Sequence, residues 1–226
     1  MRQFQLDYGS RLRWYVEGDT EEGALRRFFG EAEGHPVTIV NLRGNVVRGN
    51  ALAFREALRD DLKNGVFSVV SLDGDRTDVV RAARKAAEDD EICGQLYIND
   101  PDFEFANFSV TELEEVAWRL AEAAGEAAES RIALRTAVAT AKSGRELMEA
   151  ATRAAPTLAR LAKGREWGRR LMEYAFEHPK RETGAVRSIV EAVTAAARDV
   201  NANYNISRKE FRIDPATGRM VKRITS

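Results

Sequence analysis

The chain lacks the features that mark several large classes of protein. Cys93 is the only cysteine, which excludes an intramolecular disulfide and a thiolate zinc cluster. The longest apolar runs, such as VFSVVSL at residues 66–72, have the length of a strand and fall far short of a bilayer span. The amino-terminal segment has no apolar core of the kind found in a signal peptide. We therefore expect a cytoplasmic protein that does not enter a membrane.

The charged residues show no excess of either sign. Lysine and arginine number 35 and aspartate and glutamate 36, so the formal net charge is −1. With 44% hydrophobic and 31% charged residues, the composition is typical of a soluble globular protein. A balanced chain does not attract nucleic acid through its overall charge, so any such binding must come from local patches.

The first half of the chain alternates between short apolar runs and amphipathic segments. Runs rich in Val and Ile predict strands at residues 11–16, 36–42, 66–72 and 92–98. Apolar residues at three- and four-residue spacings predict a helix after each strand. Strand–helix alternation of this kind indicates a parallel sheet with right-handed crossovers. The predicted fold class is α/β, a Rossmann-like four-stranded parallel sheet with flanking helices and an α-helical carboxyl-terminal extension.

The strand signal disappears from about residue 130. Ala- and Leu-rich helical segments follow, with breaks near Ser143–Gly144 and at Pro156, and a further helix is predicted over residues 187–205. The tail has two short arms around a DPATG turn, which suits a hairpin. We therefore expect three regions: a sheet domain at 1–128, a helical extension packed on it at 129–200, and a basic tail or small hairpin at 201–226.

Acidic residues follow three of the four predicted strands. Glu17 follows the first strand, Asp73 and Asp75 follow the third, and Asp102 and Glu104 follow the fourth. In a parallel sheet these positions lie along one edge, where ligands bind. Carboxylates gathered there raise one another's pKa unless a cation lies among them. Such oxygen ligands suit Mg²⁺ or Mn²⁺, ions that assist phosphoryl transfer.

Ordinary local structure explains part of this acidity. Glu21 and Glu22 fit the first turn of a helix, where the macrodipole favours negative charge. The DGD motif and the NDPD segment are also common turn sequences. Glu17 precedes Gly18 and any helix, so a helix start does not account for it. The combination of Glu17 with the DGD motif, more than any single acid, predicts a metal site.

The segments YVEGDTEEGAL (15–25) and VVSLDGDRTD (69–78) lie two strand–helix units apart. With this arrangement the chain resembles the Toprim family, the catalytic module of type IA and type II topoisomerases, bacterial primases and OLD-like (overcoming lysogenization defect) nucleases. The family has a Glu after the first strand and an Asp-x-Asp after the third, which Glu17 and the DGD motif match. The resemblance covers roughly residues 10–125. The EGDTE and DFEF sequences resemble the OLD-like nucleases most.

The resemblance implies a metal-dependent nuclease that cleaves phosphodiesters of DNA or RNA, with Mg²⁺ or Mn²⁺ held by Glu17, Asp73 and Asp75. OLD-like members add an acidic ligand downstream and a lysine in the later helical part. Glu104, with Asp102 close behind, is the candidate for that acid. Lys163 is the candidate for the catalytic lysine.

The expected partner is nucleic acid, with DNA favoured over RNA. Arg43 after the second strand and Arg76 after the DGD motif lie at the same edge and are candidates for contacts to its backbone. OLD-like proteins often act beside an ATPase in phage defence. Because this chain has no GxxxxGK[ST] loop, the resemblance implies a separate ATPase subunit. A homo-oligomer is also compatible with the sequence.

Two other functions stay open. VFSVVSLDGDRT also fits the strand-then-DxDxT motif of haloacid-dehalogenase-like phosphatases, with Asp73 as nucleophile and Asp75 as acid/base. That fold usually begins with the motif strand, whereas two strand–helix units precede it here and Glu17 would have no role. The other function is a Toprim-like binding or scaffold module without catalysis, which activity surviving Glu17→Gln or Asp73→Asn would indicate.

Overall fold

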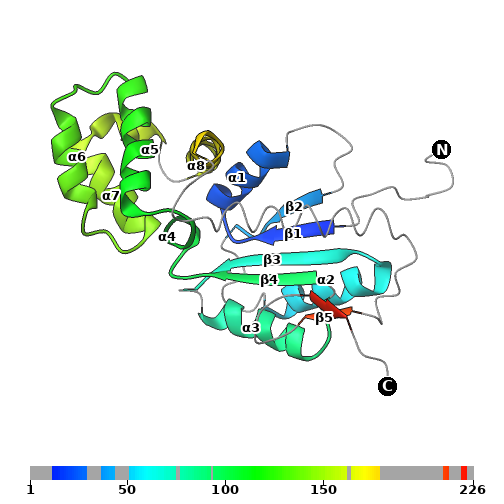
Figure 1. Ribbon diagram of the computed structural model, residues 1–226. Helices are drawn as coiled ribbons and strands as arrows, with labels where there is room; N and C mark the ends of the chain where they lie inside the picture. The colour runs from blue at the N-terminus through cyan, green and yellow to red at the C-terminus, as the bar shows by residue number, and fades with distance from the viewer. Residues whose placement is uncertain are drawn as a thin grey trace, which may run out of the picture.

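The computed structural model consists of a parallel sheet, a group of helices beyond one end of it, and a small ribbon (Figure 1). The predicted α/β class, with flanking helices and a helical extension, is confirmed. The structure describes residues 12–29, 37–43, 51–74, 77–92, 94–161, 164–178, 211–213 and 220–222.

The sheet has four parallel strands in the order β2-β1-β3-β4. Their bounds are β1 (Leu12–Val16), β2 (Val37–Asn41), β3 (Phe67–Asp73) and β4 (Gly94–Asn99). The first six residues of β3 are buried, as expected for an apolar strand between two neighbours. The chain passes from β1 out to β2 and then back past β1 to β3, so the direction of winding reverses between β1 and β3. In open α/β sheets, ligands bind beside the carboxyl ends of such a strand pair.

Three helices cover the two faces of the sheet (Figure 1). They are α1 (Asp19–Phe29) on one face, and α2 (Ala51–Asn64) and α3 (Thr77–Glu88) on the other. Adjacent strand residues face opposite ways, so Trp14 packs in the core beneath α1 whereas Tyr15 packs beneath α2 and α3. Burying a large side chain of this kind stabilises the fold by about 1.5 to 3 kcal/mol.

A group of helices follows the last strand. Its members are α4 (Phe103–Asn107), α5 (Val110–Ala123), α6 (Ser130–Val138), α7 (Gly144–Ala154), the 3₁₀ helix η2 (Pro156–Leu161) and α8 (Arg165–Glu177). A capping box starts α5, because the Ser109 Oγ accepts from the Glu112 N–H (3.3 Å) and the Glu112 Oε2 accepts from the Ser109 N–H (2.8 Å). The breaks predicted at Ser143–Gly144 and Pro156 are confirmed.

The hydrophobic core of these helices starts earlier than the boundary expected at residue 128. It begins at Phe103, runs through α5 to Met172, and includes Ala24 of α1. The helical group and the sheet therefore share apolar packing through α1. The division into separate domains stays a prediction.

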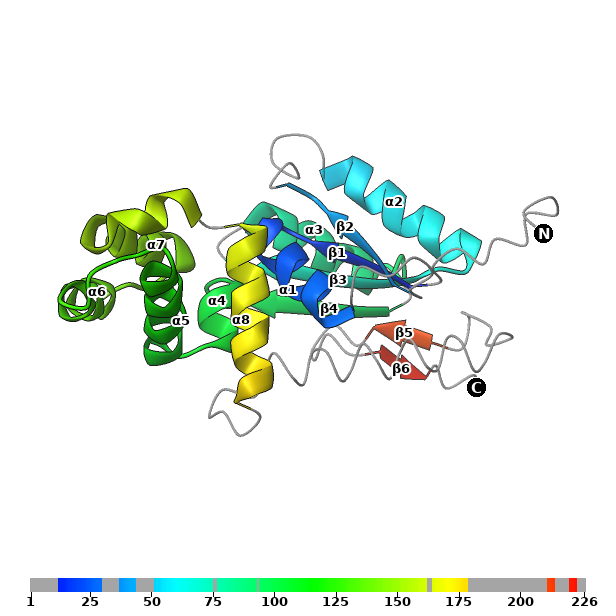
Figure 2. The same cartoon turned by 90° about the horizontal axis from the view of Figure 1, so that it is seen from above.

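The closest approach between the two regions is the crossing of α1 and α8 (Figure 2). A Cβ added to Gly168 of α8 would overlap the carbonyl oxygen of Thr20. A Cβ added to Gly23 of α1 would overlap the carbonyl oxygen of Arg165. Glycine at both positions lets the helix backbones touch, which fixes the start of α8 beside the start of α1.

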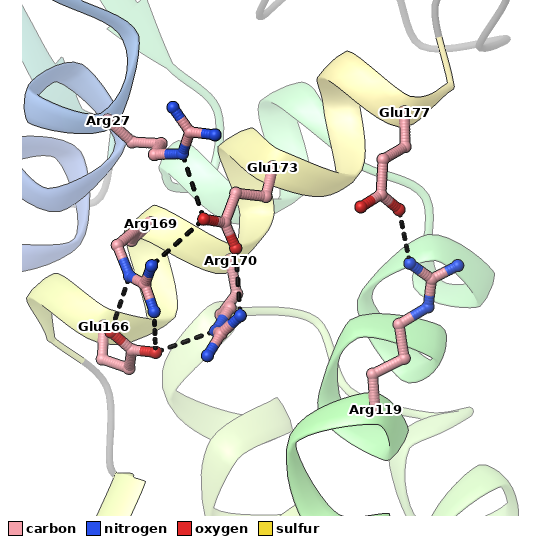
Figure 3. Close-up of polar contacts among 7 residues, drawn as sticks. All are labelled: Arg27, Arg119, Glu166, Arg169, Arg170, Glu173 and Glu177. Atoms are coloured by element: carbon pink, nitrogen blue, oxygen red, sulfur yellow. Dashed lines mark hydrogen bonds and ion pairs between the residues drawn. The ribbon is translucent and has the colours of Figure 1, made fainter. Parts of the chain in front are cut away.

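Ion pairs also tie α8 to both neighbours (Figure 3). The Arg27 Nε of α1 lies 3.0 Å from the Glu173 Oε1, and the Arg119 Nη1 of α5 lies 2.6 Å from the Glu177 Oε2. Partly exposed ion pairs of this kind contribute about 0 to 1 kcal/mol each to the stability of the fold. Their main effect is therefore on the orientation of α8 relative to α1 and α5.

The two predicted arms of the tail form a small ribbon. β5 (Phe211–Ile213) and β6 (Met220–Lys222) pair antiparallel as a sheet of their own, and β5 lies beside β4 and α3 (Figure 1). The helix predicted over 187–205 lies outside the described residues. Among the described helices, none is both long enough and apolar enough to span a bilayer.

Candidate functional site

Glu17 and Asp73 lie side by side at the carboxyl ends of β1 and β3, where the winding reverses. The backbone N–H of Asp73 donates to the Glu17 Oε2 at 3.1 Å. The Asp73 Oδ1 accepts from the backbone N–H of Phe103 at 2.9 Å. Both acids are partly exposed. The predicted meeting of Glu17 with the DGD strand is therefore confirmed, and the role of these acids as metal ligands stays a prediction.

Three predicted site residues, Asp75, Arg76 and Lys163, lie outside the described residues. Within the described ranges, no group of three His, Cys, Asp or Glu residues could hold a metal ion. The third acid of the predicted metal site therefore has to come from outside the described residues. Asp75, two residues after Asp73 in the sequence, is the candidate that the motif provides.

Asp102 anchors the helical group to the end of the sheet. Its side chain is 4% exposed, and its Oδ1 caps α4 by accepting from the Phe105 N–H at 3.1 Å. Its Oδ2 accepts from the Gly144 N–H at the start of α7, at 2.6 Å. Both oxygens therefore serve in contacts that hold helices in place, while the predicted role as a metal ligand stays untested.

Glu104 is fully buried between α4, α7 and α8. Its Oε1 accepts from the indole N–H of Trp167 at 3.2 Å. The absence of a side chain at Gly144 makes room for it, since a Cβ there would lie 2.5 Å from the carboxyl carbon. These contacts connect Glu104 to the helical core, and its predicted role as a further metal ligand stays a prediction.

The turn after β2 is fixed to the start of α1. Arg43 has a positive φ of 52°, and its backbone N–H donates to the Asn41 Oδ1 at 2.7 Å. The Asn41 Nδ2 donates to the Asp19 Oδ1 and to the Glu22 Oε2, both at 2.7 Å. Asn41 therefore positions the exposed Arg43 beside Gly18 at the carboxyl edge of the sheet.

Glu22 does more than start a helix. It lies in the first turn of α1 as predicted, but it is 3% exposed and contacts Arg26 (2.8 Å) and both the Nε and Nη2 of Arg165 (3.1 and 3.0 Å). Burial alone would raise the pKa of Glu22, but hydrogen bonds from Asn41, Arg26 and Arg165 lower it. The sequence carries no signal for the Arg165 contact, because it depends on the crossing of α1 and α8, which brings together residues 143 positions apart.

Two hollows open on opposite sides of the Glu17–Asp73 pair. Hollow A, at the ends of β1 and β2, has a volume of about 620 Å³ and is lined by Gly18, Asp19, Arg43 and Arg165. Hollow B runs along α3 beside β4 and reaches the ends of β3 and β4 at Gly74 and Asp100; it has a volume of about 610 Å³, and its other lining residues are Val80, Arg81, Arg84, Lys85, Glu88 and Ile98. Gly18 follows Glu17 and Gly74 follows Asp73, so both hollows open directly beside the acids.

Comparison with known proteins adds no relative. No protein-family model, no curated protein and no solved structure matches the chain. The resemblance to the Toprim family therefore depends on the motif residues of this sequence, whereas the Rossmann-like α/β architecture depends on the structure.

Proposed function

We propose that this protein is a Toprim-like nuclease that hydrolyses phosphodiester bonds of DNA or RNA with a divalent metal. The contact between Glu17 and Asp73 is the observation that carries the proposal. It brings a carboxylate from β1 against the backbone that starts the Asp-x-Asp motif after β3. This is the position in an open α/β sheet where ligands bind.

The proposed ion is Mg²⁺ or Mn²⁺. Glu17, Asp73 and Asp75 would hold the ion through carboxylate oxygens, the ligands that these hard cations prefer. When bound, such an ion supplies an activated water and stabilises negative charge on the leaving oxygen. Two of these three acids, Glu17 and Asp73, are already oriented by hydrogen bonds from backbone N–H groups, which supports their role as ligands.

The protein's own contacts orient the acids without help from a ligand. The Asp73 N–H holds one oxygen of Glu17, and the Phe103 N–H holds one oxygen of Asp73. Hydrogen bonds from N–H groups to carboxylates are strong and directional, so both side chains are fixed before substrate arrives. Phe103 belongs to α4, which Asp102 caps, so the helical group contributes to this orientation.

The wider assignment follows the same family resemblance. We propose nucleic acid as the substrate, DNA before RNA, and a separate ATPase subunit as partner in a cytoplasmic complex such as an anti-phage defence system. No motif that reads base sequence is evident, so the partner or the shape of the substrate would supply specificity.

The test is cleavage of supercoiled plasmid, single-stranded DNA and tRNA by the full chain with Mg²⁺, Mn²⁺ or EDTA. We expect cleavage with metal, none with EDTA, and none from Asp73→Asn or Asp75→Asn. Asp78→Asn is the matched control, because Asp78 is an exposed acid in the first turn of α3 and should remain active.

Other outcomes would contradict the nuclease. Cleavage that persists in EDTA or in Asp73→Asn would remove the proposed mechanism. Hydrolysis of a phosphomonoester such as p-nitrophenyl phosphate that needs Asp73 but not Glu17 would indicate the phosphatase instead. A folded protein that cleaves no substrate, even with its ATPase partner, would indicate the scaffold module.

A further inference from the structure

We propose that a nucleic-acid strand crosses the carboxyl edge of the sheet from hollow A to hollow B, with arginines in each hollow binding its phosphates. The Glu17–Asp73 pair would then face the phosphodiester between the two hollows. This inference rests on the proposed nuclease function and adds to it the path of the substrate and the residues that hold it.

Hollow A offers two guanidinium groups beside Glu17. Arg43 is exposed, and its side chain forms no hydrogen bond or ion pair with any described residue. Arg165 is 58% exposed and uses its Nε and Nη2 to hold Glu22. A guanidinium carries five N–H donors, so Arg165 can hold Glu22 and a phosphate together. Asp19 also lines this hollow, and its Oδ1 accepts from the Asn41 Nδ2 at 2.7 Å, so two guanidinium groups face one hydrogen-bonded carboxylate.

Hollow B is lined by three basic residues, Arg81, Arg84 and Lys85, and by two acids, Glu88 and Asp100. Arg81 and Arg84 are exposed on α3, three residues apart and thus on one side of the helix. Neither is in an ion pair or hydrogen bond with a residue that the structure describes. Lys85 differs, because its Nζ lies 2.7 Å from the Asp89 Oδ1. The two arginines are therefore the groups in hollow B that are available to a phosphate.

The order of the strands places the hollows on opposite sides of the acids. Hollow A lies at the ends of β1 and β2, whereas hollow B extends from Gly74 and Asp100, at the ends of β3 and β4, along α3. An anionic strand is repelled by clustered carboxylates, so a site of this kind needs cationic groups on both sides of the cleavage position. Arg43 and Arg165 before the acids, and Arg81 and Arg84 beyond them, provide that arrangement.

The experiment measures binding of fluorescein-labelled single-stranded DNA to the full chain in EDTA, by fluorescence anisotropy, from about 50 to 200 mM salt. Arg43→Gln tests hollow A, and Arg81→Gln/Arg84→Gln tests hollow B. The matched control is Arg145→Gln/Arg153→Gln, since these exposed arginines lie on α7 in the helical group. Arg165 is left unchanged because its loss would also remove a partner of the buried Glu22.

Removing one arginine that binds a phosphate should reduce the slope of log affinity against log salt by about 0.7 for a single strand. We therefore expect a decrease of about 0.7 for Arg43→Gln, about 1.4 for the α3 double variant, and none for the α7 control. Unchanged slopes in both test variants, or no binding by the parent protein, would overturn the proposed binding of nucleic acid in the hollows. A reduced slope in the variant of one hollow alone would show that the strand does not cross from one hollow to the other.

The two proposals fail in distinguishable ways. Binding is measured without metal, so a protein that binds with the expected slopes but never cleaves contradicts the nuclease and supports the path. Conversely, metal-dependent cleavage together with unchanged binding by the arginine variants contradicts the path alone. Circular dichroism of each variant confirms that the fold is retained before either conclusion is drawn.

Discussion

Carboxylates lie near both ends of the sheet's strands, and the protein surrounds the two groups differently. Near the amino edge, Asp61 of α2 is 1% exposed and accepts hydrogen bonds from the Tyr15 hydroxyl (2.6 Å), from the Ser68 hydroxyl (3.0 Å) and from Arg13. Burial raises the pKa of Tyr15, and the hydrogen bond to Asp61 raises it further, so the phenol stays a neutral donor. This carboxylate is enclosed by its partners.

The acids at the carboxyl edge are held but not enclosed. Glu17 and Asp73 each accept a backbone N–H, both are partly exposed, and a hollow opens beside each of them. The comparison separates two uses of a carboxylate beside one sheet. Asp61 joins α2 to the strands, whereas Glu17 and Asp73 present oxygens at the position where α/β sheets bind ligands.

The largest expected effect is the loss of cleavage in Glu17→Gln. Losing a residue that only orients a metal ligand costs about 10- to 100-fold in activity, so losing a ligand should cost more than about 100-fold. The amide keeps an oxygen for the Asp73 N–H, so the free energy of unfolding should change by less than about 0.5 kcal/mol. Cleavage rates and urea unfolding measure the two quantities. Full activity in this variant would remove Glu17 from the site.

Asp61→Ala should show the reverse pattern. It leaves the buried hydroxyls of Tyr15 and Ser68 without their acceptor, which should lower the free energy of unfolding by about 2 to 3 kcal/mol. Cleavage per folded molecule should stay at the parent level. The midpoint of urea unfolding at unchanged slope measures the loss. A stable but inactive Asp61→Ala variant would show that Asp61 serves cleavage rather than stability, against the proposed difference between the two edges.

The crossing of α1 and α8 connects the helical group to the carboxyl edge, and Gly168→Ala tests it. The added methyl meets the Thr20 carbonyl oxygen, so the helices must separate, at a cost of about 1 to 3 kcal/mol in stability. Gly18→Ala is the control, because the nearest atom to its Cβ is 3.5 Å away. Equal thermal stability of the two variants would contradict the close crossing.

The smallest expected effect is a pH dependence at Glu22. Its pKa is lower in the folded protein than in the unfolded chain, so its contribution to stability is present at neutral pH and decreases as pH falls through the folded pKa. Glu22→Gln removes this contribution. The difference in melting temperature between Glu22→Gln and the parent should therefore be largest near neutral pH and shrink below the ordinary carboxyl pKa of about 4.3. A difference that grows toward acid would contradict the assignment.

Much of the sheet could be predicted from sequence, because its signals are local. Continuous apolar runs predict strands whose observed bounds differ from expectation by no more than two residues at either end. The same alternation implied a parallel sheet, and a parallel sheet places the residues after its strands at one edge. The common edge of Glu17 and Asp73, which are 56 residues apart, follows from that topology. Their direct contact also requires β1 and β3 to be neighbours, which the strand order provides.

The surroundings of the site depend on tertiary packing and could not be predicted in the same way. Asp102 and Glu104 looked like further acids of the edge, but their observed contacts are with α4, α7 and α8. The pairing of Arg165 with Glu22 requires the α1–α8 crossing, which depends on two glycines that carry no periodic signal. The helix α4 has five residues and lies between β4 and α5, so it is too short to give a periodic pattern of apolar residues.

The most direct test of a metal site at the carboxyl edge is a titration of the full chain with Mn²⁺ in the absence of nucleic acid. The electron paramagnetic resonance signal of the unbound ion reports how much Mn²⁺ is bound. The parent protein and Asp78→Asn should deplete the free-ion signal equally. Glu17→Gln, Asp73→Asn and Asp75→Asn should each weaken binding by more than about 10-fold. Equal binding by all five proteins, or none by the parent, would contradict a metal site at the carboxyl edge.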